Sequence, residues 1–286
     1  MPGGVEFFYG LLDDSALLSA AMQDVEAVVH LAAKVERDSR EIQEMRNINA
    51  DGARNVYIAA LAKGCKFFLH MSSAGVYGSP RGPLPFREDD ASCPVTPYQV
   101  TKWEAEQALC QIAANDTTLN ILRPAGLYGP GSLLEIPAYK KVLARRWSLE
   151  PKGGVVVHPT HVRDIVEAVI ALIDRPASHQ TVFNIGGERL IRVQDLLALQ
   201  AEILDVRRRR IVVPTWIATP LAGVAKLLFA VIGRPKPLLA DMYRGRLFCA
   251  AVDDRRFRQS YPAVPVVRLA DGLREHLDWA RMHQLI

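Results

Sequence analysis

One stretch decides the fold: the apolar run Phe67-Phe68-Leu69-His70-Met71, which continues directly into Ser72-Ser73-Ala74-Gly75-Val76-Tyr77-Gly78. A short apolar run that ends in small hydroxyl residues and glycine is typical of a buried strand in a parallel sheet. The carboxyl edge of such a sheet is where open α/β folds bind their ligands. The two serines are therefore predicted to lie at a ligand-binding edge, and a serine turn that merely closes a strand is the plainer interpretation.

Strand and helix patterns alternate on both sides of this stretch. Predicted strands cover residues 5–9, 27–31, 66–71 and 119–122, and predicted helices cover 15–22, 42–63 and 97–114. Continuous apolar strands separated by helices predict an α/β fold of the doubly wound, Rossmann type, whose parallel sheet is covered on both faces. Residues 155–157 and 182–185 are further strands, which return either to this sheet or to a small extra one.

The pattern changes beyond residue 129, where proline, glycine and basic residues become frequent and helical patterns dominate. We expect a dinucleotide-binding domain over residues 1–128 and 160–186. A smaller, mostly helical substrate lobe is expected over 129–159 and 187–286.

Composition excludes several classes of protein. Of the 286 residues, 49% are hydrophobic and 23% are charged, which rules out a disordered chain or a fibrous repeat. The net charge of +4 is too small to argue for nucleic acid as a partner. Four cysteines without C-x-x-C spacing, and histidines without an H-E-x-x-H motif, predict neither a disulfide framework nor a metal site. No signal-peptide pattern is present, so the expected compartment is the reducing cytoplasm.

The chemistry is expected in the segment Thr96-Pro97-Tyr98-Gln99-Val100-Thr101-Lys102. Thr96 and Gln99 have capping-box spacing and proline suits the first helical position, so a helix is predicted to begin here. Tyr98 and Lys102 then share one helix face. The ammonium and the positive helix end are expected to lower the pKa of Tyr98, which could then exchange a proton with a substrate hydroxyl or carbonyl. For this motif alone, a surface helix with an ordinary tyrosine and a solvated lysine is the alternative.

Together these segments resemble the extended short-chain dehydrogenases/reductases, that is, the NAD-dependent epimerase/dehydratase family. The resemblance covers nearly the whole chain, with motifs in the family's order and spacing. They are VVHLAA (28–33), NADG (49–52), SSAGVYG (72–78), YQVTK (98–102), LRPAGLYGPG (122–131), HVRD (161–164), NIGG (184–187) and the ending 272–279.

The resemblance implies catalytic roles for four residues. Tyr98 would be the acid/base, Lys102 would lower its pKa and hold the nicotinamide ribose, and Ser73 would orient the reacting oxygen. Asn49 would hold the active-site helix and a water, although an exposed position inside a helix is the plainer interpretation.

The resemblance also implies a cofactor, NAD or NADP, and a small-molecule substrate. Cofactor contacts are implied at Leu31, Ala32, Ala33, Ser72, Tyr98, Lys102 and Pro124, and substrate contacts at Ala74, Gly126 and Tyr128. Plainer interpretations stay open for three of these: close helix–strand packing for Ala32 and Ala33, and the end of a strand for Pro124.

The chain departs from the family near its start, where the glycine-rich turn between a strand and a helix is lacking. One β-α-β unit of roughly 30 residues or more is expected to be missing before residue 5, through a truncated reading frame rather than a natural short form. The strands at 5–9 and 27–31 then lose the neighbours between them, so they close the gap, pair with another chain or pack poorly. We therefore expect weak dinucleotide binding or none, and no signal that separates NAD from NADP. Leu11 also stands where the family often has an aspartate.

Three positions bear on the substrate. Gly126 stands where many sugar-nucleotide enzymes carry asparagine, and this form looks more like the hydroxysteroid and dihydroflavonol reductase branches. Gly75 and Val76 replace the acidic pair typical of dehydratases. The expected function is hydride transfer at a secondary alcohol or ketone, as an oxidoreductase or epimerase with a sterol-like or other apolar substrate. A nucleotide-sugar epimerase and a non-catalytic relative are the alternatives.

A long apolar stretch, residues 211–233, follows four arginines, and its one charged residue is Lys226. A pair of helices in the substrate lobe is the favoured interpretation. Peripheral membrane contact through this stretch, with basic residues on anionic lipid, is the alternative. A homodimer is a further expectation.

Overall fold

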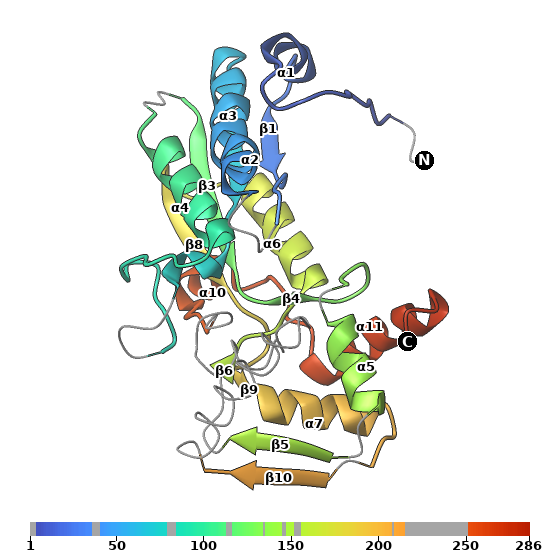
Figure 1. The fold of residues 1–286 in the computed structure, drawn as a ribbon. Helices are drawn as coiled ribbons and strands as arrows, with labels where there is room; N and C mark the ends of the chain where they lie inside the picture. The colour runs from blue at the N-terminus through green and yellow to red at the C-terminus, as the bar shows by residue number, and fades with distance from the viewer. Residues whose placement is uncertain are drawn as a thin grey trace. The chain divides into compact units, whose positions relative to one another are not determined.

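The computed structural model describes residues 4–35, 41–78, 84–112, 116–133, 135–144, 147–151, 156–207, 209–214 and 251–286. The chain divides into two compact units, whose elements are labelled in Figure 1. The first unit is Met1–Val76, Pro94–Arg123 and Ala168–Phe183, and the second is Tyr77–Cys93, Pro124–Glu167 and Asn184–Ile286.

The central sheet of the first unit has the strand order β1-β2-β3-β8. Its strands are β1 (Ala27–His30), β2 (Phe67–Met71), β3 (Thr118–Pro124) and β8 (Thr181–Ile185). The pairs β1–β2 and β2–β3 are parallel, as predicted. Strand β8 confirms the prediction at 182–185 and returns to the main sheet. This parallel sheet with flanking helices is a Rossmann-type α/β fold.

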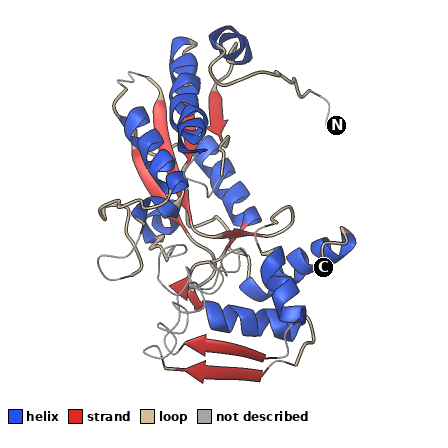
Figure 2. Cartoon of the chain, in the orientation of Figure 1, coloured by secondary structure: helices blue, strands red, loops and turns tan. Residues whose placement is uncertain are grey.

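Helices cover the sheet in the first unit, and in Figure 2 α3 and α4 lie over the strands. They are α1 (Ser15–Ala21), α2 (Ile42–Arg46), the π-helical turn η2 (Asn47–Asp51), α3 (Gly52–Ala62) and α4 (Pro97–Cys110). The core forms where Val56 and Tyr57 of α3 and Leu109 of α4 pack against Phe68 and Ile121 of the sheet. Burial of these large apolar side chains holds the layers together.

The predicted strand over residues 5–9 is wrong. These residues form no strand, and Tyr9 is 85% exposed, with Val5 and Phe7 about half exposed. A strand needs a hydrogen-bonded neighbour, and β1 pairs only with β2 among the described residues. The apolar pattern at 5–9 is that of a strand, but none of the described strands pairs with it.

The second unit combines short strand pairs with helices. Its strands are β4 (Leu127–Tyr128), β5 (Trp147–Pro151), β6 (Val156–Val157), β7 (Thr160–His161), β9 (Ile191–Arg192) and β10 (Arg209–Val213). Its helices are α5 (Ile136–Ala144), α7 (Val193–Ile203), α10 (Arg255–Ser260) and α11 (Leu269–Met282), while α6 (Val162–Asp174) is shared with the first unit. The strand predicted at 155–157 is β6, which pairs with β9 in a small separate sheet.

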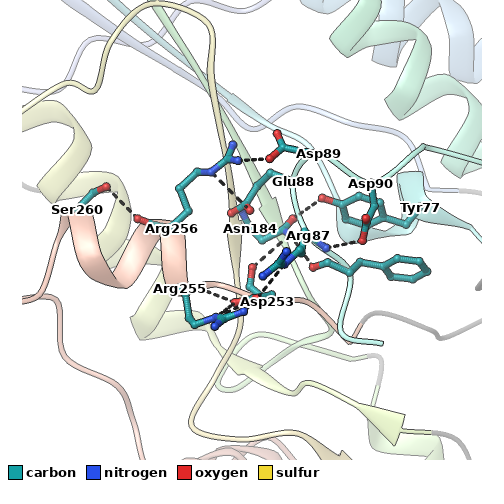
Figure 3. A network of polar contacts seen from close by, with 11 residues as sticks. Tyr77, Arg87, Glu88, Asp89, Asp90, Asn184, Asp253, Arg255, Arg256 and Ser260 are labelled. Atoms are coloured by element: carbon teal, nitrogen blue, oxygen red, sulfur yellow. Dashed lines mark hydrogen bonds and ion pairs between the residues drawn. The ribbon is translucent and has the colours of Figure 1, made fainter. Parts of the chain in front are cut away.

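Asn184 is the centre of a polar network in the second unit (Figure 3). Its buried side-chain amide accepts a hydrogen bond from the Tyr77 hydroxyl at 2.8 Å and donates to the Phe86 carbonyl at 3.0 Å. Its backbone N–H donates to Glu88 Oε1 at 3.0 Å, and the Asp253 carbonyl lies 3.4 Å from the amide nitrogen. A buried amide with satisfied donors and acceptors ties these separate stretches of chain together.

Most of the apolar stretch 211–233 lies outside the described residues, so neither interpretation of it is settled. Residues 211–213 belong to β10. Within the described part of the chain, no helix combines the length and the apolar composition needed to cross a membrane.

Candidate active site

Helix α4 begins as the sequence predicts. The Gln99 N–H donates to Thr96 Oγ1 at 3.3 Å, and the Gln99 side-chain oxygen accepts from the N–H groups of Thr96 and Val95 at 3.1 and 2.9 Å. Thr96 is the N-cap and Pro97 is the first residue of the helix, so the predicted capping box is confirmed. The cap fixes the first turn of α4, which carries Tyr98.

Ser73 and Tyr98 meet in the first unit. Ser73 lies two residues beyond β2, and its Oγ accepts a hydrogen bond from the Gly75 N–H at 3.0 Å. Burial raises the pKa of Tyr98 above its ordinary value, and a side-chain hydrogen bond with Ser73 partly offsets that rise. The predicted lowering of this pKa is therefore wrong, because burial disfavours the phenolate more than its surroundings stabilise it. Tyr98 is a neutral phenol at pH 7.

Lys102 lies one turn further along α4 and is 1% exposed, so the alternative of a solvated surface lysine is wrong. Its Nζ donates to the Met71 carbonyl at the end of β2, over 2.6 Å. Burial lowers the pKa of Lys102 to about 8, and the negative charge of Glu106 opposes that change. Its predicted contact with the nicotinamide ribose stays a prediction.

Asn49 is fully buried in the π-helical turn η2, so the solvent-facing alternative is wrong. Its Nδ2 donates to Thr101 Oγ1 of α4 and to the Lys34 carbonyl, both at 2.9 Å, and its Oδ1 accepts from the Lys34 N–H at 2.7 Å. Asn49 thus links α4 to the chain that follows β1. A π-turn of this kind often marks a functional position in a helix.

Ser72 directs its hydroxyl to α4. Its side chain is buried, and its hydroxyl donates to Glu106 Oε1 of α4. Glu106 also pairs with Arg123, whose Nη2 and Nε lie 2.6 and 3.0 Å from its two oxygens. The hydroxyl is engaged by a buried ion pair, which ties the end of the strand to α4. The predicted cofactor contact of Ser72 stays a prediction.

Sequence reasoning missed Glu106, Arg123, and the histidine pair His30 and His70. The two imidazole rings are paired by strand register on β1 and β2 and stack with centroids 5.6 Å apart. Burial lowers the pKa of His30 to about 4 and holds that of His70 well below its usual range, with the Lys102 charge acting in the same direction on both. The one signal for Glu106 was its spacing, four residues after Lys102.

The residues predicted to face a cofactor after β1 are exposed. Leu31 is 61% exposed, and Ala32 and Ala33 also lie on the surface, so close helix–strand packing is the wrong interpretation of the alanines. Pro124 is the buried last residue of β3 and is assigned to the second unit. Its contact with the nicotinamide stays a prediction.

The three candidate substrate residues differ in exposure. Gly126 is exposed, with no heavy atom within 4 Å of the place where a Cβ would stand. Ala74 is fully buried, and Tyr128 is buried with its ring edge-on to His161 at 5.1 Å. Their roles stay predictions.

Comparison with known proteins identifies the family. The model of the NAD dependent epimerase/dehydratase family matches residues 2–186. This chain therefore belongs to the NAD-dependent epimerase/dehydratase family, as the sequence motifs predict, and the members of that family are NAD-dependent enzymes.

Its relatives act on different substrates. The chain is 26% identical over 224 residues to a UDP-glucose 4-epimerase of Vibrio cholerae, covering 74% of this chain and 67% of the relative. It is 24% identical over 303 residues to a 3β-hydroxysteroid-dehydrogenase/decarboxylase of Arabidopsis thaliana, covering 96% of this chain and 52% of the relative. The chain thus spans between half and two thirds of these relatives.

Solved structures share the fold. RMD from Pseudomonas aeruginosa, solved in complex with NADPH, superposes with a TM-score of 0.73 at 21% identity, covering 98% of this chain and 89% of that one. The fold is therefore one that holds a nicotinamide dinucleotide in its relatives.

The described residues suit one end of such a cofactor and not the other. The exposed small residues Ala32 and Ala33 after β1, and the pair of Ser73 after β2 with Tyr98 in the first turn of α4, suit a nicotinamide and its ribose. For the pyrophosphate, no glycine-rich turn joins a strand to a helix in the described ranges. The N-terminus of α1 is already capped by the Asp14 carboxylate, which accepts from the Leu17 N–H at 2.9 Å and would repel a phosphate.

Proposed function

We propose that this chain is an NAD(P)-dependent oxidoreductase or epimerase that acts on a secondary alcohol or ketone, with Tyr98 exchanging the proton of the substrate oxygen. The observation that carries the proposal is the Ser73–Tyr98 hydrogen bond in a Rossmann-type fold of this family. Two hydroxyl groups that meet at the carboxyl edge of a parallel sheet can hold one substrate oxygen between them.

The two hydroxyls have different tasks. Ser73 Oγ accepts from the Gly75 N–H and hydrogen-bonds to Tyr98, so a substrate oxygen placed between the two hydroxyls would receive the Ser73 proton instead of Tyr98. Tyr98 keeps its proton at neutral pH and can donate it to a carbonyl oxygen as a general acid. A bound nicotinamide supplies the hydride that the substrate carbon receives. Because the pKa of Tyr98 is raised, alcohol oxidation, which needs the phenolate as base, is favoured only at alkaline pH.

The substrate proposed is apolar and sterol-like. It rests on Gly126, which offers no side-chain amide to a sugar, and on the similarity to the plant hydroxysteroid dehydrogenase/decarboxylase along 96% of this chain. A nucleotide-sugar epimerase is the second candidate, supported by the similarity to the Vibrio cholerae enzyme. A non-catalytic relative is the third, supported by the poor fit to a pyrophosphate.

One set of assays tests these candidates. The purified chain is incubated with NADH or NADPH and a panel of sterol-like ketones, and separately with NAD and UDP-glucose. Cofactor fluorescence gives the dissociation constant, and micromolar affinity would overturn the expected weak binding. Tyr98→Phe should lower turnover about 10²- to 10⁴-fold, while the exposed Tyr9→Phe, which loses the same hydroxyl elsewhere, should not change it. Turnover that survives in Tyr98→Phe contradicts the proposed acid, and no turnover with any pair supports the non-catalytic relative.

A further inference from the structure

Three ionisable side chains lie on one face of helix α4. Two of them contact residues at the ends of β2 and β3. Tyr98, Lys102 and Glu106 are four residues apart, so they lie above one another on one helix face. The buried Glu106 is 2% exposed, receives the Ser72 hydroxyl, and pairs with Arg123 at 2.6 Å. A carboxylate buried to this degree needs such partners, because a buried charge without them is costly.

Burial disfavours the charge of Lys102, and few groups near it are anionic. Its Nζ has the Met71 carbonyl as partner, and His30 and His70 of the neighbouring strands are neutral imidazoles. Tyr98 is a neutral phenol, Asn49 does not ionise, and Arg123 is a cation. Among the described residues, Glu106 is the one anion whose charge acts on Lys102.

We propose that Glu106 is a positioning residue of the active site, which keeps Lys102 charged next to the Ser73–Tyr98 pair. The role of Lys102 in catalysis rests on the proposed function, whereas the effect of Glu106 on Lys102 does not. In a buried site, an opposite charge one helix turn away offsets part of the free-energy cost of burying an ammonium. Arg123 contacts both oxygens of Glu106 and so offsets the cost of burying the carboxylate.

The test follows the titration of Lys102 itself. The full chain is labelled with ¹³C-lysine, and the Cε resonance lost in Lys102→Arg is followed against pH by NMR. Wild type should titrate near pH 8. Glu106→Gln keeps an oxygen for Ser72 but loses the charge, and should lower the midpoint by about one pH unit. Ser72→Ala keeps the charge but loses the hydrogen bond, so its midpoint should match wild type.

A second variant guards against loss of the fold, since Glu106→Gln leaves Arg123 buried without its anion. The double variant Glu106→Gln/Arg123→Met replaces both charged side chains by uncharged ones of similar size. Folded proteins often tolerate such a replacement of a buried ion pair. Its Lys102 midpoint should also fall. Only variants with a native near-UV circular dichroism spectrum are compared. If the Lys102 midpoint of such a variant equals that of wild type, the inference is wrong. It is also wrong if Ser72→Ala lowers the midpoint by the same amount.

Turnover separates this inference from the proposed function. With an active wild type, Glu106→Gln should lose about five-fold in rate at pH 8, because the charged fraction of Lys102 falls from about one half to about one tenth. A wild type without turnover overturns the proposed function, while the NMR midpoints still decide the role of Glu106.

Discussion

Replacing His30 by phenylalanine should make the protein less sensitive to acid. His30 is 4% exposed, and its Nε2 has no hydrogen-bond partner among the described residues. Its ring stacks on Phe68 at 6.2 Å and on His70, so a phenyl ring has a similar place to occupy. The folded protein resists protonation of this imidazole, whereas the unfolded chain does not.

The size of the effect follows from the two pKa values of His30. The folded value is about 4 and the ordinary value is 6.5. Between these values the unfolded chain binds more protons, so the free energy of unfolding rises with pH and falls as acid is added. For one such group the loss relative to pH 7 is about 2 kcal/mol at pH 5 and about 3 kcal/mol at pH 4. His30→Phe escapes this loss.

Urea unfolding followed by circular dichroism at pH 7, 6, 5 and 4 measures the effect. The difference in free energy of unfolding between wild type and His30→Phe should shift by about 3 kcal/mol across this range, in favour of the variant at pH 4. Any packing cost of the larger ring is the same at each pH and drops out. The exposed His283→Phe is the control and should show no such trend. A difference for His30→Phe that is constant with pH would refute the reasoning.

Two further predictions concern stability. Thr96→Ala removes the oxygen that accepts the Gln99 N–H, so it should cost about 1 kcal/mol, while Thr96→Ser should restore most of it; equal urea midpoints for the two variants would contradict the capping role. The pKa of Asp253 is lowered to about 2, chiefly by its hydrogen bonds from Arg255, so this carboxylate stabilises the fold above pH 4 and loses that effect as the pH falls toward 2. Asp253→Asn should therefore cost about 1–2 kcal/mol at pH 7, after allowance for the exposed arginine, and the gap should close in acid; a gap that persists at pH 2 would contradict this.

Elements that depend on local sequence were predictable. The capping box at Thr96 and Gln99 involves atoms a few residues apart, so the sequence contains all its parts. The strands β1, β2 and β3 were predicted to within a few residues, because a continuous apolar run indicates a buried strand whatever the order of strands in the sheet. The positions of Ser73 and Tyr98 follow from these elements, since one lies beyond a strand end and the other in a capped first turn.

Features that depend on distant partners were not predictable. Residues 5–9 have the pattern of a strand, but pairing needs a neighbour that the pattern does not provide. The raised pKa of Tyr98 depends on how deeply the folded chain buries the ring, which spacing to Lys102 does not reveal. Glu106 meets Ser72 and Arg123, which are 34 and 17 residues away, so only the fold assembles this buried group.

All four side chains with predicted catalytic roles, Asn49, Ser73, Tyr98 and Lys102, belong to the first unit. Their described hydrogen bonds run to partners within that unit, such as Thr101 for Asn49 and the Met71 carbonyl for Lys102. Substitutions in the second unit are thus expected to leave the described hydrogen bonds of these four side chains intact.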